Sequence, residues 1–238
     1  MFVVIARIVN TTNLIAVLVL LSFCLSTSAS ARWKDSDLEW KLKRDRKGIQ
    51  VYLAKVPGSK FRAILSTMEV DVPPRELAAL VMDLENCPNW AAMCKSAEVI
   101  ERLSPSVCYV RSVNDAPFPV RDRDVIAKVT WFHDRDSGKI SMHSDAAPEK
   151  LPKQKGLVRV NAASSEWHFT PQENGKVLVE NYAHVDPNGK IPAWLINLMI
   201  VESPYKTLKK MRELALTGRY KGVELGFVED IVQVEDIE

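Results

Sequence analysis

Four histidines are the side chains best suited to acid–base chemistry in this 238-residue sequence: His133, His143, His168 and His184. An imidazole titrates near neutral pH and can therefore accept and return a proton. The four histidines are well separated along the chain, and no nucleophile elbow, HExxH, P-loop or dinucleotide-binding glycine pattern accompanies them. The sequence therefore favours a protein that is not an enzyme. An acid–base role for His143 or His184 is the catalytic alternative.

Three cysteines, Cys87, Cys94 and Cys108, follow the N-terminal apolar segment. On one continuous helix, the spacing of Cys87 and Cys94 would separate them by about 10 Å along the axis, too far for a disulfide. Pro88 and Asn89 predict a turn between them. We expect a Cys87–Cys94 disulfide that clamps this turn and leaves Cys108 buried and free; three reduced thiols are the alternative. Because no histidine stands near these cysteines at ligand spacing, no metal site is expected.

Residues 1–31 have the layout of a secretory signal peptide. Arg7 precedes an apolar run at 14–25, and Ala29-Ser30-Ala31 forms an A-x-A cleavage pattern. The run is shorter than the about 20 residues that span a bilayer. We therefore expect export to the periplasm or the extracellular space; an uncleaved membrane anchor is the alternative.

The rest of the chain is almost neutral. Without Arg7, the 32 lysines and arginines become 31, against 30 acidic residues. Because no surplus of positive charge is present to neutralise phosphates, nucleic acid is not an expected partner. Residues 222–238 hold six acids and no base. We expect one domain over 32–217 and an acidic C-terminal tail over 218–238, with a peripheral strand as the alternative for the tail.

The period of the apolar residues changes along the domain. Residues 33–47 predict an amphipathic helix. A hairpin at 49–55 and 61–70 follows, and then a helix over 72–86 with a short second helix after it. Alternation with a period of two then predicts antiparallel strands. These strands are expected at 97–103, 107–113, 125–132, 139–143, 157–160, 166–170 and 177–185.

A long helix over 191–216 is expected to end the domain. Its apolar arc is too wide for a narrow helix–helix seam, so it suits covering a sheet. Asn197 lies near the middle of this arc and needs a ligand group, cavity water or a sheet side chain as its partner. Pro204 should kink the helix. The order of elements predicts an α+β fold in which a curved antiparallel sheet wraps around this helix.

Three segments resemble the StAR-related lipid-transfer (START) domain family. They are 117–125 (PFPVRDRDV), 152–159 (PKQKGLVR) and 186–197 (DPNGKIPAWLIN). The resemblance spans residues 33–217 and looks like that of a bacterial-type secreted member. It implies a helix-grip fold with a tunnel for one lipid between sheet and helix. Sterol-carrying members place a buried base six residues after the motif arginine. If Arg123 corresponds to that arginine, the base is replaced here by Val129, and the resemblance does not extend to sterol binding.

Strand alternation selects candidates for the tunnel wall. Lys128 and Thr130 belong outside, which turns their neighbours inward. The predicted ligand-binding residues are Tyr109, Arg111, Ala127, Val129, Trp131, Val179, Asn181, Trp194, Asn197 and Val201. Because a cation inside an apolar tunnel is costly without a partner, an outward, solvated Arg111 is the alternative. Residues 121–124 are interpreted as a structural salt-bridge cluster.

The function expected from these observations is non-catalytic. The protein would bind one lipid or other apolar small molecule in an internal tunnel and carry or transfer it, with no cofactor. We expect a monomer that touches a membrane surface transiently. Two alternatives remain: a helix-grip sensor or scaffold that responds to a hydrophobic ligand, and a cyclase- or hydratase-like enzyme that uses His143 or His184 in the cavity.

Overall fold

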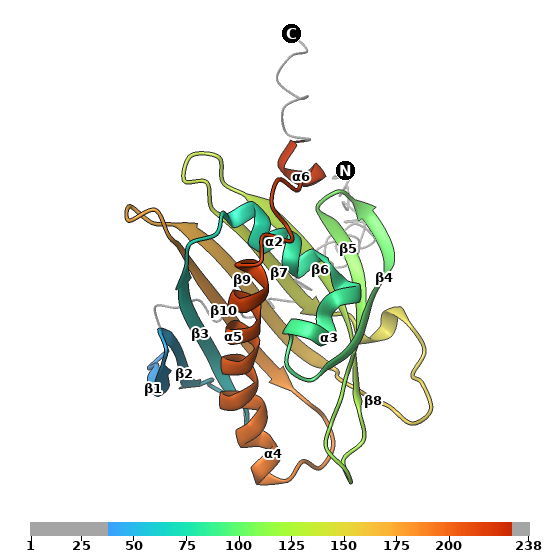
Figure 1. The fold of residues 1–238 in the computed structure, drawn as a ribbon. Helices are drawn as coiled ribbons and strands as arrows, with labels where there is room; N and C mark the ends of the chain where they lie inside the picture. Colours follow the sequence, from blue (N-terminus) through green and yellow to red (C-terminus); the bar gives the residue numbers. More distant parts are fainter. Residues whose placement is uncertain (1–37, 230–238) are drawn as a thin grey trace, which may run out of the picture. The chain divides into compact units, whose positions relative to one another are not determined.

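The computed structural model describes residues 38–229, so the signal peptide expected at 1–31 lies outside the described residues. These residues form a ten-stranded sheet (Figure 1). Nine strands follow the order β1-β2-β3-β10-β9-β7-β6-β5-β4, and the tenth, β8, pairs with β6 in parallel. All neighbours along the main order pair antiparallel. The strands are β1 (Lys41–Arg46), β2 (Ile49–Lys55), β3 (Arg62–Val70), β4 (Cys94–Ser104), β5 (Val107–Asn114), β6 (Arg123–His133), β7 (Ile140–Ala146), β8 (Val158–Arg159), β9 (Ala162–Pro171) and β10 (Val177–Asp186).

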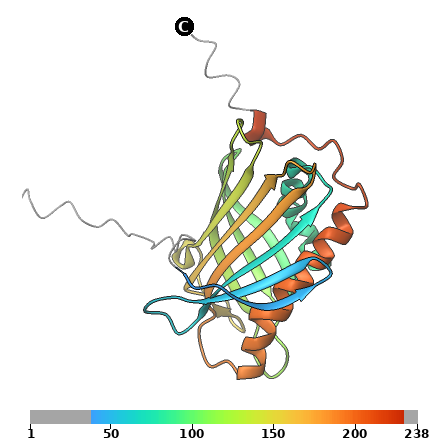
Figure 2. The same cartoon turned by 90° about the vertical axis from the view of Figure 1, so that its left-hand side faces the viewer.

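Helices cover one face of this sheet (Figures 1 and 2). The helix α5 contacts β2 and β3, and α2 contacts β7 and β9. Leu77 and Leu80 of α2 are fully buried, as are Leu208 and Met211 of α5, so the apolar core lies between the two layers. This arrangement confirms the predicted α+β helix-grip fold. The helices are α2 (Pro74–Met82), η2 (Leu84–Asn86), α3 (Cys87–Trp90), η3 (Pro148–Lys150), α4 (Ala193–Asn197), η4 (Leu198–Glu202), α5 (Ser203–Ala215) and α6 (Gly226–Glu229).

The first described strand corrects the sequence analysis, which expected a helix over 33–47. Residues 41–46 form β1, and Arg46 pairs with Ile49 of β2. Lys47 and Gly48 between them both have positive φ, 55° and 69°. Two consecutive residues with positive φ make the tight turn that matches the twist of a hairpin. The helical spacing of apolar residues was therefore misleading, and Leu42 lies on an edge strand, 48% exposed.

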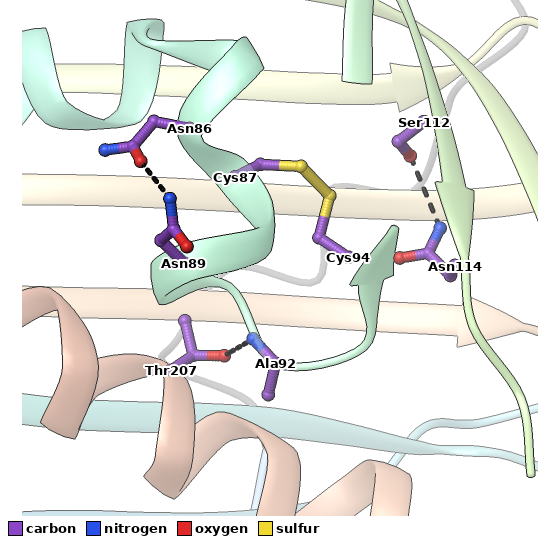
Figure 3. The surroundings of a disulfide bond; sticks show 8 residues. All are labelled: Asn86, Cys87, Asn89, Ala92, Cys94, Ser112, Asn114 and Thr207. Carbon is purple, nitrogen blue, oxygen red and sulfur yellow. Dashed lines mark hydrogen bonds between the residues drawn. A yellow bond between two sulfur atoms is a disulfide. The ribbon is translucent and has the colours of Figure 1, made fainter. Parts of the chain in front are cut away.

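A disulfide fixes the turn between α3 and β4. It joins Cys87, the first residue of α3, to Cys94, the first residue of β4, as Figure 3 shows. The chain reverses after α3 because Met93 adopts a positive φ of 68°. The amide of Ala92 in this turn donates to Thr207 Oγ1 of α5 at 2.9 Å. The turn is thus tied both to the sheet and to the covering helix, while Cys108 is buried and free.

The long C-terminal helix forms over residues 193–215 in three parts, with η4 between α4 and α5. The segment η4 is a π-helix, and it ends two residues before Pro204. Because proline has no amide hydrogen, a wider turn before it accommodates the missing bond. Ser203 Oγ donates to the carbonyl of Leu198 at 3.1 Å and so satisfies one group in this turn. No helix among the described residues is long and apolar enough to cross a membrane.

The expected acidic tail over 218–238 also needs correction in its first part. Tyr220 is buried, and its hydroxyl donates to Asp83 Oδ2 at 2.7 Å and accepts from Asn86 Nδ2 at 2.9 Å. Further along, Phe227 is buried with its ring centroid 5.6 Å from that of Trp131. The apolar residues interspersed among the acids explain this packing. Residues 230–238 lie outside the described part of the chain.

Candidate functional site

A cavity of about 870 Å³ lies between the inner face of the sheet and the helices. This volume is typical of ligand pockets in proteins. Its wall consists of residues of β3, β4, β5, β6, β7, β9 and β10 and of the loop before β3, together with the α2–β4 segment and the C-terminal helix. Most wall residues are apolar or carry only a small hydroxyl group, so the cavity suits an apolar guest.

The strand β6 contributes a continuous stripe to this wall. Ala127, Val129 and Trp131 line the cavity, whereas Lys128 is exposed on the other face. The structure therefore places these three residues where strand alternation predicted them. Their contact with a ligand stays a prediction.

The neighbouring strand β5 faces the other way from the prediction. Cys108, Val110 and Ser112 line the cavity, so Tyr109 and Arg111 point to the outer face. Arg111 forms an ion pair with Glu98, the residue opposite it on β4, and donates a hydrogen bond to Gln154. The Lys150 ammonium lies 4.3 Å from the centroid of the Tyr109 ring. Placing Tyr109 and Arg111 inside was wrong because their partners stand on the outer surface of the sheet.

On β10, Val179 and Asn181 both lie on the inner face of the sheet, as predicted, but only part of this face borders the cavity. Asn181 lines it, together with Ala183 and Val185. Val179 points the same way but is fully buried in the packed core and does not reach the cavity. Asn181 Nδ2 donates to Ser165 Oγ at 3.3 Å and to the carbonyl of Glu166 at 3.1 Å. Its amide is therefore held in place by β9.

The C-terminal helix closes the cavity with a different side from the one expected. Asn197 lines the cavity but is exposed, so it lies at the rim rather than in a buried centre. Val201 is half-buried and is not part of the wall, and the side chain of Trp194 lies outside the described residues. The wall residues of this helix include Ile196, Ile200 and Pro204. These three residues recur at a spacing of four and so share one side of a helical wheel, away from Val201.

Arg123 is a wall residue that the sequence analysis did not select. It is the first residue of β6 and is only 6% exposed. Its Nη1 donates to the carbonyl of Arg121, while its Nε is buried without a hydrogen-bond partner among the described residues. Burial lowers the pKa of this guanidinium and the nearby Arg121 lowers it further, whereas Asp122 raises it. The signal was present, since Arg123 has the same strand parity as Ala127 and Val129.

The next residue, Asp124, belongs to a buried ion pair. Arg159 of β8 donates to Asp124 Oδ2 through Nε at 2.9 Å and through Nη2 at 2.7 Å. Arg159 also donates to the carbonyls of Leu151 at 2.8 Å and Pro152 at 3.1 Å. In the salt-bridge cluster expected at 121–124, Asp124 pairs with Arg159 and Asp122 pairs with Lys95, whereas Arg123 forms no ion pair among the described residues.

The histidines considered for catalysis lie away from the cavity. His143 Nε2 is 3.7 Å and His168 Nε2 is 3.1 Å from Glu166 Oε2 on the outer face of β7 and β9. These three groups have ligand atoms within 4.8 Å of one another and could hold a transition-metal ion there. His184 contacts Ser59 Oγ at 2.9 Å, while its neighbours Ala183 and Val185 face the cavity. An acid–base role for His143 or His184 inside the cavity was therefore wrong.

The START domain model matches residues 21–215, and the chain therefore belongs to the START domain family. The chain is 32% identical over 177 residues to an uncharacterized protein of Pseudomonas aeruginosa, an alignment that covers 74% of this chain and 87% of that protein. It is 27% identical over 164 residues to the phosphatidylcholine transfer protein of Mus musculus, covering 67% of this chain and 75% of that protein. These matches confirm the resemblance inferred from the three sequence segments.

A solved structure agrees with this assignment. The STAR-related lipid transfer protein of Xanthomonas axonopodis, a fragment of residues 25–204, superposes with a TM-score of 0.68 at 30% identity. The match covers 74% of this chain and 98% of that fragment. The chain thus has the START fold and is related to lipid transfer proteins.

Proposed function

We propose that this protein binds one lipid, or another largely apolar small molecule, in its cavity and carries it without altering it covalently. The cavity of about 870 Å³ is the observation that carries this proposal. Burying an apolar chain against such a wall contributes about 25 cal/mol per Å² of apolar surface removed from water. The relationship to a phosphatidylcholine transfer protein and a STAR-related lipid transfer protein supports the same function.

A loop beside the cavity suits transient contact with a membrane. Phe118, between β5 and β6, is 95% exposed. The same loop and the approach to α4 border a second hollow of about 610 Å³, whose lining includes Arg121 and Lys190. An exposed aromatic ring beside cations favours binding at the lipid headgroup level. We therefore propose that a monomer loads and releases its ligand with this loop against the membrane.

We further propose that the protein works outside the cytoplasm, in the periplasm or the extracellular space. The signal-peptide pattern at 1–31 supports export, and the Cys87–Cys94 disulfide is typical of an oxidising compartment. The mass of the protein recovered from its host tests this proposal. A mature chain that begins at Arg32 is expected, and a cytoplasmic chain that retains residues 1–31 would contradict it.

Native mass spectrometry combined with vesicle transfer tests the carrier function. Protein purified from its host should carry one lipid per chain, and the protein should speed transfer of a fluorescent phospholipid between two phosphatidylcholine vesicle populations. A protein that is always empty and leaves the transfer rate unchanged would refute the proposal.

A cavity-filling variant makes this test specific. Ala127→Trp places an indole in the cavity and should abolish lipid binding, because its volume competes with the ligand. Lys128→Trp adds the same ring to the outer face of β6 and should leave binding unchanged. Equal loss of binding in both variants would show that the cavity is not the binding site.

A further inference from the structure

The charged residues of the cavity wall all have one sign. They are Lys60, Arg62, Arg102 and Arg123, and no aspartate or glutamate among the described residues joins them. Lys60, Arg62 and Arg102 are exposed, so water solvates their charges. Arg123 is 6% exposed and differs from the other three in having little solvent.

The acids nearest to Arg123 in the sequence are already engaged elsewhere. Asp124 is held by Arg159 at 2.7 and 2.9 Å. Asp122 accepts from Lys95 Nζ at 2.9 Å and from the amide of Ala116 at 3.0 Å, although its charge still acts on Arg123. A guanidinium carries five N–H donors, and a buried cation without a bonded anion is costly. The wall therefore presents donors that a bound anion would satisfy.

The cavity-facing residues of β5 and β6 change from polar to apolar in the same direction along both strands. Along β6 the inward residues run from Arg123 through Val125, Ala127 and Val129 to Trp131. Their partners on β5 run from Asn114, opposite Arg123, through Ser112 to Val110 and Cys108. Along these two strands, the end at Arg123 is thus cationic and rich in hydrogen-bonding groups, while the end at Trp131 is apolar; Arg102 of β4, which pairs with Cys108 near that end, is exposed. This order matches a molecule with one charged head and one apolar tail.

We propose that the cavity selects an amphiphile whose headgroup has a net negative charge, a phosphate monoester or a carboxylate, that binds against Arg123 with its tail toward Trp131. This proposal rests on the carrier function proposed above and specifies its ligand class. Arg123 also lines the second hollow, together with Arg121 and Lys190, so two further cations stand at the headgroup end. Asn114 and Ser112 supply neutral hydrogen-bonding groups beside it.

A competition between lipids with matched chains tests the charge preference. Protein stripped of co-purified lipid is incubated with vesicles that contain equal amounts of dioleoyl phosphatidic acid, oleic acid and dioleoyl phosphatidylcholine, and bound species are measured by native mass spectrometry. An anionic lipid should exceed phosphatidylcholine by about tenfold or more, because the choline cation of phosphatidylcholine offsets the charge of its phosphate and weakens the charge-assisted bond to Arg123. The dominant species, phosphatidic acid or oleate, identifies the headgroup as a phosphate or a carboxylate. Equal occupancy by the zwitterionic lipid would overturn the proposal.

Two arginine variants locate the preference. Arg123→Gln should lower the anionic-to-zwitterionic ratio about tenfold while phosphatidylcholine still binds. Arg111→Gln is the matched control, since Arg111 lies on the adjacent strand but faces outward, and the ratio should not change. An unchanged ratio in Arg123→Gln would overturn the proposal. Absence of any bound lipid in the wild-type protein would instead refute the carrier function itself.

A second variant keeps the test valid if Arg123→Gln does not fold. Asn114→Asp places a carboxylate opposite Arg123 across the β5–β6 pair. This internal anion should neutralise Arg123, raise the melting temperature of the lipid-free protein and reduce the anionic preference. A variant that binds anionic lipid as strongly as the wild type would overturn the proposal.

Discussion

Arg159 and Arg123 stand on paired strands at one end of the sheet and are almost equally buried, at 3% and 6% exposure. Their surroundings differ. Arg159 has a carboxylate, Asp124, and backbone carbonyls around its guanidinium. Arg123 has one carbonyl, and its Nε has no partner among the described residues. The two arginines are similarly buried but differ in their hydrogen-bond partners. Arg159 has a structural role because the fold supplies its partners, whereas Arg123 suits a binding role in which a ligand supplies them.

The largest expected effect comes from breaking the satisfied arginine. Arg159→Met leaves Asp124 buried without its cation and should lower the free energy of unfolding by about 3–5 kcal/mol. Urea denaturation measures this loss. Arg111→Met, which removes an arginine from a more solvent-exposed pair, is the control and should cost about 1 kcal/mol or less. A loss in Arg159→Met no larger than the control's would contradict the structural role.

The unsatisfied arginine should behave in the opposite way. In lipid-free protein, Arg123→Met removes a buried charge and leaves no anion without its bonded partner, so the free energy of unfolding should stay level or rise by about 1 kcal/mol. The same urea series measures it. A destabilisation close to that of Arg159→Met would show that the two arginines do not differ in kind.

The smallest effect is expected at Asp122, the half-buried counterpart of Asp124. Asp122→Asn weakens the bonds to Lys95 and Ala116 and should cost about 1 kcal/mol or less. The amide of Ala116 and then Lys95 lower the pKa of Asp122. Its contribution is therefore present above the ordinary carboxyl pKa of about 4 and is lost as the pH falls below it. The stability difference between wild type and variant, measured by denaturation at several pH values, should shrink on acidification; a constant difference would contradict this assignment.

Much of the fold could be predicted because hydrophobic period and turn residues are local signals. Residues 49–55 form β2 with the predicted bounds, and the inner faces of β6 and β10 follow from alternation alone. The edge strand β1 was missed because the turn at Lys47 and Gly48 was interpreted as the end of a helix. Helical spacing in a short segment does not separate an exposed edge strand from a surface helix.

The site was harder to predict because it depends on partners distant in sequence. Both faces of β5 carry mixed residues, so its orientation follows from Glu98 and Gln154, which receive Arg111 outside. Arg123 was assigned to a salt bridge because acids flank it. In the folded chain, Arg159 binds the carboxylate of Asp124, and Arg123 is left facing the cavity.

The π turn in the covering helix has a mechanical consequence. Leu198–Glu202 separates a short segment, α4, from α5, which is tied to the α3–β4 turn through Thr207. A π turn can shift along a helix when amide groups exchange carbonyl acceptors one at a time. Few backbone hydrogen bonds are then broken at once, which matters beside an apolar cavity where water cannot replace them. We therefore expect the first turns of the helix to move more readily than α5, which is held by the bond from Ala92 to Thr207. Faster amide hydrogen exchange at 199–203 than at 207–214 would be the signature of this movement, and equal protection would contradict it.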